Sequence, residues 1–145
     1  GYAIKNDIHI TKPSVECQAR TMKDALRSAG INSVDYINAH GTGTVLNDEC
    51  ESEAIKWVFR NPPPVSSTKS MHGHLMGAAG AVEFVACLMA MERQILPPTA
   101  SLSEPISDLD YIPVARPAKI YSVMSNSFAF GGSSAVLIAS KHEHH

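Results

Sequence analysis

The first apolar pattern along the chain has the period of an α-helix. Its stripe recurs at every third or fourth position and consists of Met22, Ala25, Leu26 and Ala29. Ser14 stands before the stripe, where its hydroxyl can cap the first turn, and Gly30 follows as a typical stop. The pattern predicts a helix over residues 14–30 with one buried face.

Two further segments have helical patterns. A helix is predicted to open near Asn47 and Asp48, where acidic residues suit the positive helix end, and to stop before the prolines at 62–64. Its apolar stripe consists of Ala54, Ile55, Val58 and Phe59. Residues 77–93 are apolar on most sides, which predicts a central helix enclosed by its neighbours.

Short runs rich in β-forming residues alternate with these helices and cover residues 34–39, 65–68, 120–127 and 135–140. The order of helix, strand, helix, strand, helix and two final strands predicts an α/β fold, with a mixed sheet and helices on its faces. Loops are predicted after strands at 40–44, 69–73 and 128–132, the last as a hairpin loop. Because ligands gather beyond strand ends in such sheets, His40, Lys69 and the 128–132 loop are expected to converge on one site.

The composition narrows the class of protein. With 145 residues, 44% of them apolar, the chain can bury one core, and residues 1–140 are predicted to form a single domain. The formal net charge of −2, without a basic run, argues against nucleic acid and against an anionic membrane as partners. The most apolar stretch, 75–91, contains Glu83 and two glycines, which favours a buried helix over a membrane span.

The cysteines and the chain ends indicate a piece of a longer, cytoplasmic protein. Cys17, Cys50 and Cys87 are widely spaced and include no Cys-x-x-Cys pair, so neither a disulfide framework nor a cysteine-rich zinc site is expected. The chain begins without methionine and has no signal-peptide pattern, and residues 141–145 are interpreted as an added tail. We therefore expect an excised domain.

Three segments carry a family resemblance: residues 38–44 (Asn-Ala-His-Gly-Thr-Gly-Thr), residues 67–80 (Ser-Thr-Lys-Ser-Met-His-Gly-His-Leu-Met-Gly-Ala-Ala-Gly) and residues 125–132 (Ser-Asn-Ser-Phe-Ala-Phe-Gly-Gly). In this order they resemble the histidine, lysine–histidine and phenylalanine–glycine loops of the condensing enzymes, specifically the β-ketoacyl-acyl-carrier-protein synthase II branch. The likeness extends over nearly the whole chain, and residues 10–13 also resemble nodulation-type ketoacyl synthases.

The resemblance implies one half of a duplicated thiolase-like fold and an acyltransferase activity. The implied reaction is decarboxylative Claisen condensation of malonyl-acyl carrier protein with an acyl-enzyme thioester, in fatty-acid or polyketide synthesis. The implied partners are acyl carrier protein, the missing N-terminal half of the synthase, and a second copy in a homodimer. No metal or organic cofactor is expected, since the substrates travel on the phosphopantetheine of acyl carrier protein.

Decarboxylation of a malonyl thioester creates an enolate whose oxygen needs hydrogen-bond donors in a dry pocket. By resemblance, His40 and His74 are these donors, and Lys69 tunes the electric field around them. Glu83 lies in an otherwise apolar helix and is expected to pair with Lys69, because an unpaired buried carboxylate is costly. The resemblance also implies an oxyanion-hole N–H and gating rings at Phe130 and Phe128, and pantetheine contacts at Thr42, Thr44, Gly131 and Gly132.

The chain departs from the family pattern at several positions. Ala129 stands where the family usually has glycine, and Ser133 and Ser134 replace its usual Thr-Asn. The family's nucleophilic cysteine lies in the N-terminal half, and no cysteine here stands in a comparable strand-to-helix elbow. The chain alone is therefore expected not to complete the catalytic cycle.

Two alternatives remain open from the sequence. A non-catalytic scaffold or chain-length-factor-like subunit would share the fold, but it is expected to lose the histidine pair, which is present here. A metal-dependent hydrolase would bind zinc through His40, His72 and His74, although no carboxylate or cysteine stands at a convincing ligand spacing.

Overall fold

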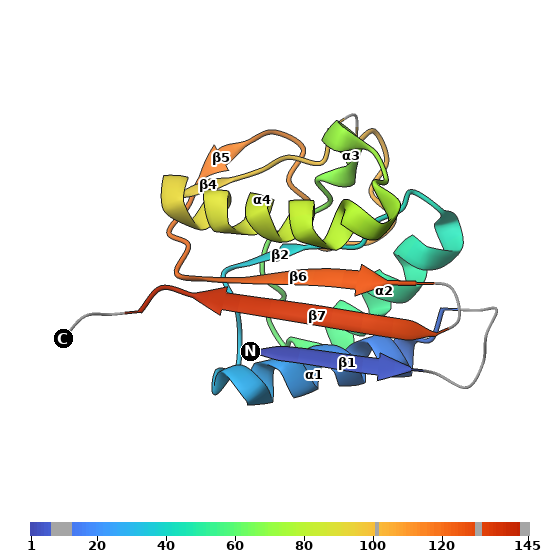
Figure 1. The fold of residues 1–145 in the computed structure, drawn as a ribbon. Helices are drawn as coiled ribbons and strands as arrows, with labels where there is room; N and C mark the ends of the chain where they lie inside the picture. The colour runs from blue at the N-terminus through green and yellow to red at the C-terminus, as the bar shows by residue number, and fades with distance from the viewer. Residues whose placement is uncertain (7–12, 101, 130–131, 143–145) are drawn as a thin grey trace.

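A five-stranded mixed sheet forms the centre of the computed structural model, which describes residues 1–6, 13–100, 102–129 and 132–142. The strand order is β1-β7-β6-β2-β3 (Figure 1). The strands are β1 (Tyr2–Asn6), β2 (Tyr36–Asn38), β3 (Val65–Ser66), β6 (Ser122–Phe128) and β7 (Ser133–Ser140). β1, β7 and β6 pair antiparallel, whereas β2 pairs parallel with both β6 and β3. The predicted α/β class with a mixed sheet is confirmed.

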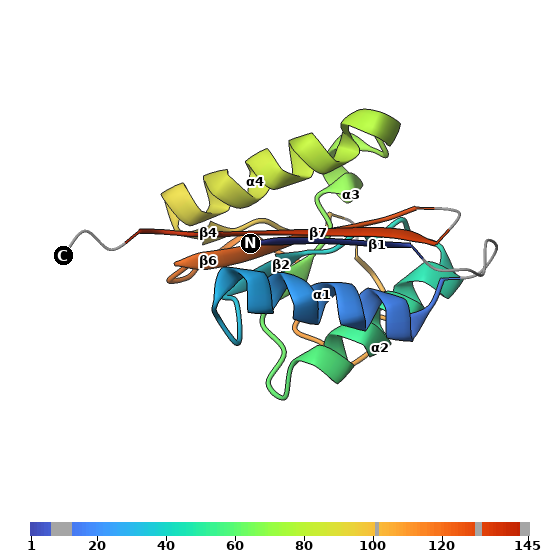
Figure 2. The same ribbon diagram turned by 60° about the horizontal axis from the view of Figure 1, so that its bottom comes forward.

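Helices cover both faces of the sheet, as Figure 2 shows. α1 (Val15–Ala29) and α2 (Val45–Val58) lie side by side on one face, and α4 (Ala79–Arg93) lies on the other. A short helix, α3 (Lys69–His72), and a 3₁₀ turn, η1 (Met76–Ala78), connect β3 to α4. Because β2 and β3 are parallel neighbours, the loops that follow them leave the sheet at the same end of the strands.

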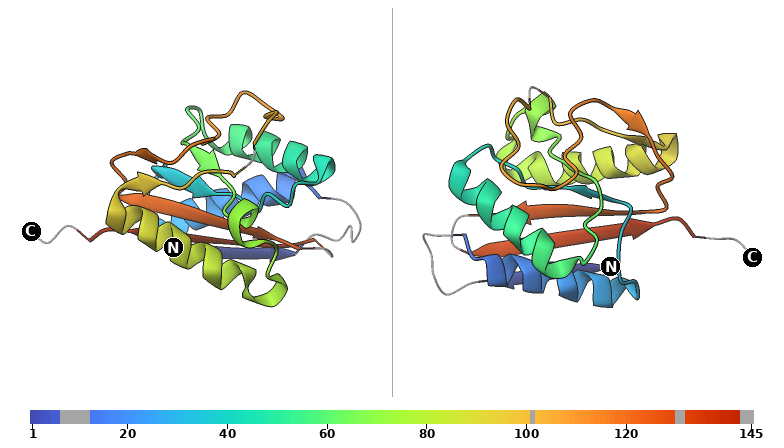
Figure 3. Two further views of the ribbon diagram at one scale, coloured as in Figure 1. Left: turned by 90° about the horizontal axis from the view of Figure 1, so that it is seen from above. Right: turned by 180° about the vertical axis from the view of Figure 1, so that it is seen from behind.

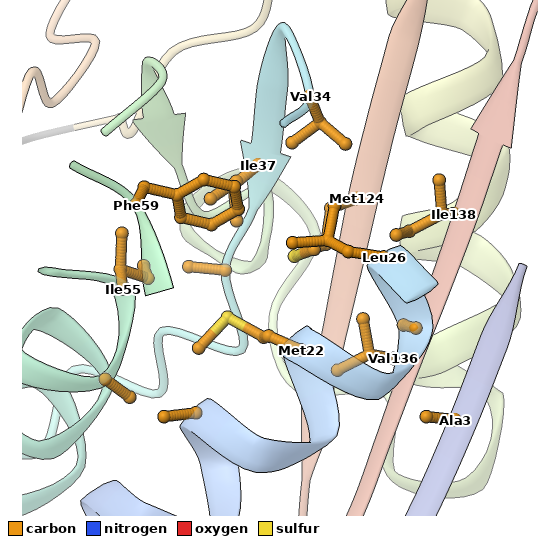
Figure 4. Close-up of a cluster of buried hydrophobic side chains, with 14 of the residues drawn as sticks. Ala3, Met22, Leu26, Val34, Ile37, Ile55, Phe59, Met124, Val136 and Ile138 are labelled. Atoms are coloured by element: carbon orange, nitrogen blue, oxygen red, sulfur yellow. The ribbon is translucent and has the colours of Figure 1, made fainter. Parts of the chain in front are cut away.

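The predicted start and stop of α1 are confirmed. The Ser14 hydroxyl accepts a hydrogen bond from the Cys17 N–H at 3.1 Å, and Gly30 has φ of 70°, the left-handed conformation that ends helices. The apolar stripe of α1 packs against α2 and the sheet in the cluster of Figure 4, where Met22, Ile37 and Met124 have no exposed surface. A second, smaller cluster lies between the sheet and α4.

Several predicted boundaries were wrong. β2 spans only three residues, and α2 begins at Val45, before Asn47. Residues 69–72 form α3 where a loop was predicted, because the Gly73 N–H closes a helical turn onto the Lys69 carbonyl at 2.7 Å. Phe128 ends β6 and is not in the hairpin loop, since β6 pairs with β7 as far as Ser134.

Three strands were not predicted. β1 is an edge strand, and β4 (Ile95–Leu96) with β5 (Arg116–Pro117) forms a separate two-stranded sheet. Two-residue strands are too short to show an alternating pattern. The long connection between β4 and β6 passes beside β3 and α3 (Figure 3). It is held there by hydrogen bonds such as Ser67 N–H to Thr99 Oγ1 at 3.1 Å and Ala100 N–H to Ser70 Oγ at 2.7 Å.

The expectation that α4 is enclosed by its neighbours was wrong. One side of the helix packs on the sheet, but the other exposes an apolar row of Val82, Val85, Leu88 and Met89, with exposed fractions from 36% to 53%. β1 and β7 add Tyr2, Ile4 and Leu137 on the same side of the sheet. We call these seven residues the α4-side surface. In the described part of the chain, no helix has the length and hydropathy needed to cross a membrane.

The chain on its own is expected to self-associate through the α4-side surface, because large exposed apolar patches mark interaction sites. Val85→Glu combined with Met89→Lys places an oppositely charged i,i+4 pair on α4 and should shift the sedimentation velocity profile toward monomer. Trp57→Lys is the matched control, since Trp57 is 60% exposed on α2, across the sheet. A parent chain that sediments as a monomer over a wide concentration range would contradict this prediction.

Candidate active site

Two histidines from separate loops meet beyond the C-terminal ends of two parallel strands. His40 follows β2, and His74 follows α3, which itself follows the neighbouring strand β3. Their ring centroids lie 5.8 Å apart, and the ring planes are nearly perpendicular at 89°. His40 is almost buried, with 9% of its surface exposed, whereas His74 is exposed. The expected convergence is confirmed for the loops that follow β2 and β3, whereas residues 130–131 of the third expected loop lie outside the described residues.

A buried ion pair contacts the ring of His40. Lys69 opens α3 and forms an ion pair with Glu83 of α4, and the side chains are only 5% and 1% exposed. The Lys69 Nζ also lies 3.3 Å from the His40 Nδ1. The expected pairing of Glu83 with Lys69 is confirmed. It follows from the cost of burying either charge alone.

The surroundings of His40 keep its imidazole neutral. Burial, then the Lys69 cation and then His74 together lower the pKa of His40 from 6.5 to about 3. An ammonium has only donors, so the His40 Nδ1 accepts the hydrogen bond from Lys69. The ring proton of neutral His40 therefore lies on Nε2.

A backbone amide selects the same tautomer at His74. The Met76 N–H donates a hydrogen bond to the His74 Nδ1 at 3.1 Å, so the proton of the neutral ring lies on Nε2. Met76 has φ of 50°, a left-handed conformation that is uncommon for a residue other than glycine. Such conformations cost about 1–3 kcal/mol and cluster at functional sites. The fold therefore maintains a strained residue where it orients a histidine.

Glu51 of α2 fixes the backbone of the His40 loop, a role that the sequence did not reveal. Its carboxylate accepts hydrogen bonds from the N–H groups of His40 at 2.8 Å and Gly41 at 3.0 Å, and from the Asn126 amide at 3.2 Å. Burial raises the pKa of Glu51, and these hydrogen bonds partly oppose that effect. The sequence did contain a sign that Glu51 is buried. Position 51 lies three residues before Ala54, which places both residues on the same, buried side of α2.

Gly41 is required where it stands. Its φ is +42°, and a Cβ at this position would lie 2.5 Å from the Ser67 Cβ. Both the conformation and the space therefore exclude a side chain. The close approach brings the loop after β2 against the segment that leads into Lys69.

A cavity of about 460 Å³ lies beside the histidine loops. Its lining includes Gly41, Thr42, Gly43, Lys69 and His74, and it extends to α2 and to residues 99–100 and 102–111. Thr42 lines the cavity, and its hydroxyl lies 3.1 Å from the hydroxyl of Thr44, an exposed residue at the start of α2.

The phenylalanine–glycine loop is described only in part. Phe128 is buried, with its ring centroid 6.0 Å from that of His40. Gly132 has φ of +72°, a glycine-type conformation just before β7. Phe130 and Gly131 lie outside the described residues, so their expected roles stay predictions.

Two of the three cysteines have surroundings that disfavour a thiolate. Burial raises the pKa of Cys50 to about 11 and that of Cys87 to about 12. Cys17 is half-buried on α1, with its Sγ 3.7 Å from the Ser134 hydroxyl. The expectation that the nucleophile comes from outside this chain stays a prediction.

His72 does not join the other two histidines. Its ring nitrogens lie 2.8 Å from the Gly73 carbonyl oxygen and 3.1 Å from the Thr68 hydroxyl. Among the residues that the structure describes, no three potential ligands of the His, Cys, Asp or Glu type are grouped to hold a metal ion. The geometry thus counts against the alternative of a zinc site built from His40, His72 and His74.

Comparisons with known proteins agree on one family. The family profile described as "Beta-ketoacyl synthase, C-terminal domain" matches residues 1–103. Nodulation protein E of Rhizobium sp. (strain N33) is 50% identical over 137 residues, which cover 89% of this chain and 34% of that protein. The 3-oxoacyl-[acyl-carrier-protein] synthase 2 of Coxiella burnetii is 47% identical over 152 residues, which cover 97% of this chain and 37% of that protein.

Solved structures give the same result. The ishigamide ketosynthase/chain length factor superimposes with a TM-score of 0.94 at 42% identity, covering 99% of this chain and 37% of that one. A type II polyketide synthase acyl-carrier protein in complex with its ketosynthase, AntDE:AntF, matches with a TM-score of 0.89 at 36% identity, covering 99% and 38%. This chain therefore spans somewhat more than a third of the length of these relatives.

Breaking the ion pair from one side is expected to destabilise the fold. Lys69→Met leaves the Glu83 carboxylate buried without its cation, which typically costs about 3–5 kcal/mol. The double variant Lys69→Met with Glu83→Gln should recover a large part of this loss, as measured by urea unfolding. A Lys69→Met chain as stable as the parent would show that the pair is not needed to compensate burial.

The folding stability should fall as the pH drops below about 6.5. Between pH 6.5 and about 3 the unfolded chain binds a proton at His40 that the folded chain does not, so the unfolded state gains stability as the pH falls. Urea unfolding of the parent and of His40→Gln is compared at about pH 7.5 and about pH 5. Glu51, whose pKa is also shifted, is present in both chains, so the difference between them isolates the contribution of His40. The loss should be smaller in His40→Gln, and an equal loss would contradict the assignment.

Proposed function

Because this chain belongs to the β-ketoacyl synthase family, as its C-terminal domain, we propose that the protein containing it is a β-ketoacyl-acyl-carrier-protein synthase. Its reaction is the decarboxylative condensation of malonyl-acyl carrier protein with an acyl-enzyme thioester, in fatty-acid or polyketide synthesis. The observation that carries the proposal is the pair of imidazoles of His40 and His74, in each of which Nδ1 accepts a hydrogen bond from the protein and Nε2 is left to donate.

This pair suits the chemistry of decarboxylation. When the bond between the carboxylate and the methylene carbon breaks, CO₂ leaves and its electron pair moves through the methylene carbon onto the thioester oxygen. The two Nε2–H groups then donate to the developing enolate oxygen, which is the largest stabilising contribution in reactions of this type. Because the tautomers are fixed beforehand, no reorganisation is needed during the reaction.

The condensation step forms the new carbon–carbon bond and frees the enzyme's cysteine. The enolate carbon attacks the acyl thioester carbonyl, a carbon–carbon bond forms, and the bond to the enzyme sulfur breaks, which releases a cysteine thiolate. That cysteine lies outside this chain, so the chain alone does not complete the cycle. Lys69 contributes by keeping His40 neutral and by holding its Nδ1 as an acceptor.

Binding of the carrier arm is assigned to the loops around the cavity. Thr42 and Thr44 provide hydroxyls for the amides of phosphopantetheine, and Gly131 and Gly132 let the backbone approach the arm. The Phe130 N–H completes the oxyanion hole of the acyl-enzyme, and the rings of Phe130 and Phe128 gate the acyl tunnel. Acyl carrier protein is the proposed partner, in line with the structure of a related ketosynthase bound to its carrier protein.

The remainder of the synthase is proposed to cover the α4-side surface. The relatives are nearly three times as long as the matched region, so their chains contain enough additional residues for this. We also propose that the intact enzyme is a homodimer in the cytoplasm, where free cysteines such as those found here are stable. A metal or organic cofactor has no role in the proposed reaction.

A chain-length-factor-like subunit is the second candidate, since one of the structural relatives contains such a factor. That role does not need the decarboxylation machinery. His40, Lys69, His74 and Glu83 are all present and mutually arranged here, which favours the enzyme.

The test uses the full-length protein that contains this chain. His74→Ala is expected to abolish malonyl decarboxylation while leaving much of the acylation of the nucleophilic cysteine, since His74 acts on the malonyl oxygen. Radiolabelled CO₂ release and acyl-enzyme mass spectrometry measure the two steps separately. Lys119→Ala changes an exposed lysine and is the control. Undiminished CO₂ release by His74→Ala would remove the assigned role.

A further inference from the structure

His72 is bonded on both sides of its ring. The Gly73 carbonyl can only accept, so the His72 Nδ1 donates to it across 2.8 Å. Neutral His72 then has an unprotonated Nε2, which accepts from the Thr68 hydroxyl at 3.1 Å. The ring thus links Thr68, the N-cap residue of α3, to the peptide that immediately precedes His74.

Thr68 passes this link into the core. It is 1% exposed, and its hydroxyl accepts from the Asn38 side-chain amide at 3.0 Å while donating to His72. The Thr68 N–H donates to the Asn38 Oδ1 at 3.2 Å, which fixes the orientation of that amide. The Thr68 hydroxyl also lies 3.4 Å from the Asn38 Oδ1, but the His72 Nε2 is the nearer acceptor, and with that choice donors and acceptors alternate along the path.

Asn38 is the last residue of β2, two residues before His40. The second hydrogen of its amide donates to the carbonyl of Glu83 at 3.2 Å, so this fully buried side chain contacts both the N-cap residue of α3 and α4. The path Asn38–Thr68–His72–Gly73 connects the strand that carries His40 with the peptide that carries His74.

From this path we infer that His72 and Thr68 are positioning residues for the histidine pair. Each holds the His74 loop at a set distance from β2 without touching the substrate. We call the hydrogen-bond path Asn38–Thr68–His72–Gly73 the relay. The effect of the relay on rate rests on the proposed function, but the relay itself is a property of the folded chain. His72 thereby has a use distinct from metal binding.

Kinetics of the full-length protein test the effect on rate. Thr68→Val keeps the shape of the side chain but removes the hydroxyl. It should lower kcat for malonyl decarboxylation about 3- to 10-fold, the effect of one neutral hydrogen bond, with KM unchanged. Thr68→Ser restores the hydroxyl and should restore kcat. His72→Ala should lower kcat in the same way, and His72→Gln, which can still accept from Thr68, should recover part of it.

Folding and function are separated by two further measurements. Acylation of the nucleophilic cysteine should be unchanged in all four variants, and this shows that each variant is folded. Histidine-selective ¹³C NMR should show a shifted His74 resonance in Thr68→Val and a parental one in Thr68→Ser. An unmoved His74 resonance together with parental kcat in Thr68→Val would overturn the relay.

The outcome for the proposed function is distinguishable from the outcome for the relay. A parent protein that releases no CO₂ from malonyl-acyl carrier protein contradicts the proposed function, whatever the variants do. In that case the His74 resonance alone decides the relay: it is supported if Thr68→Val moves the resonance and overturned if it does not.

Discussion

A single ammonium buried between a carboxylate and an imidazole is the interaction on which this site depends. Lys69 compensates the charge of Glu83, and without that carboxylate its own burial would be prohibitively costly. The same ammonium occupies the His40 Nδ1, which fixes the tautomer and disfavours a second positive charge on the ring. One cation thus makes the ion pair tolerable and keeps the imidazole a neutral donor.

Backbone hydrogen bonds give that arrangement its accuracy. Glu51 binds the N–H groups of His40 and Gly41 from the α2 side of the sheet. Asn38 binds Thr68 and the Glu83 carbonyl on the α4 side. The strand that carries His40 is therefore tied to both helix layers by buried side chains, so an imidazole at the end of a three-residue strand has a defined position.

The sequence predicted the parts of the molecule in which a pattern coincides with a local physical cause. Ser14 and Gly30 mark α1 because capping depends on neighbours in sequence. The pairing of Glu83 with Lys69 was predictable from the cost of burial alone. The strands β1, β4 and β5 were missed, since the pairing of an edge strand such as β1 depends on a distant partner, β7. The roles of Glu51, Asn38 and the Met76 amide were missed because each includes a hydrogen bond with a backbone group on one side, which no side-chain motif encodes.

α4 connects the chemistry of the site to the packing of the whole protein. Its inner side carries Glu83 and the buried Cys87, while its outer side carries the exposed Val85 and Met89. An α-helix moves nearly as a rigid body, because its backbone hydrogen bonds join every turn to the next. The helix that places Glu83 against Lys69 is therefore the same rigid element whose outer side presents the α4-side surface.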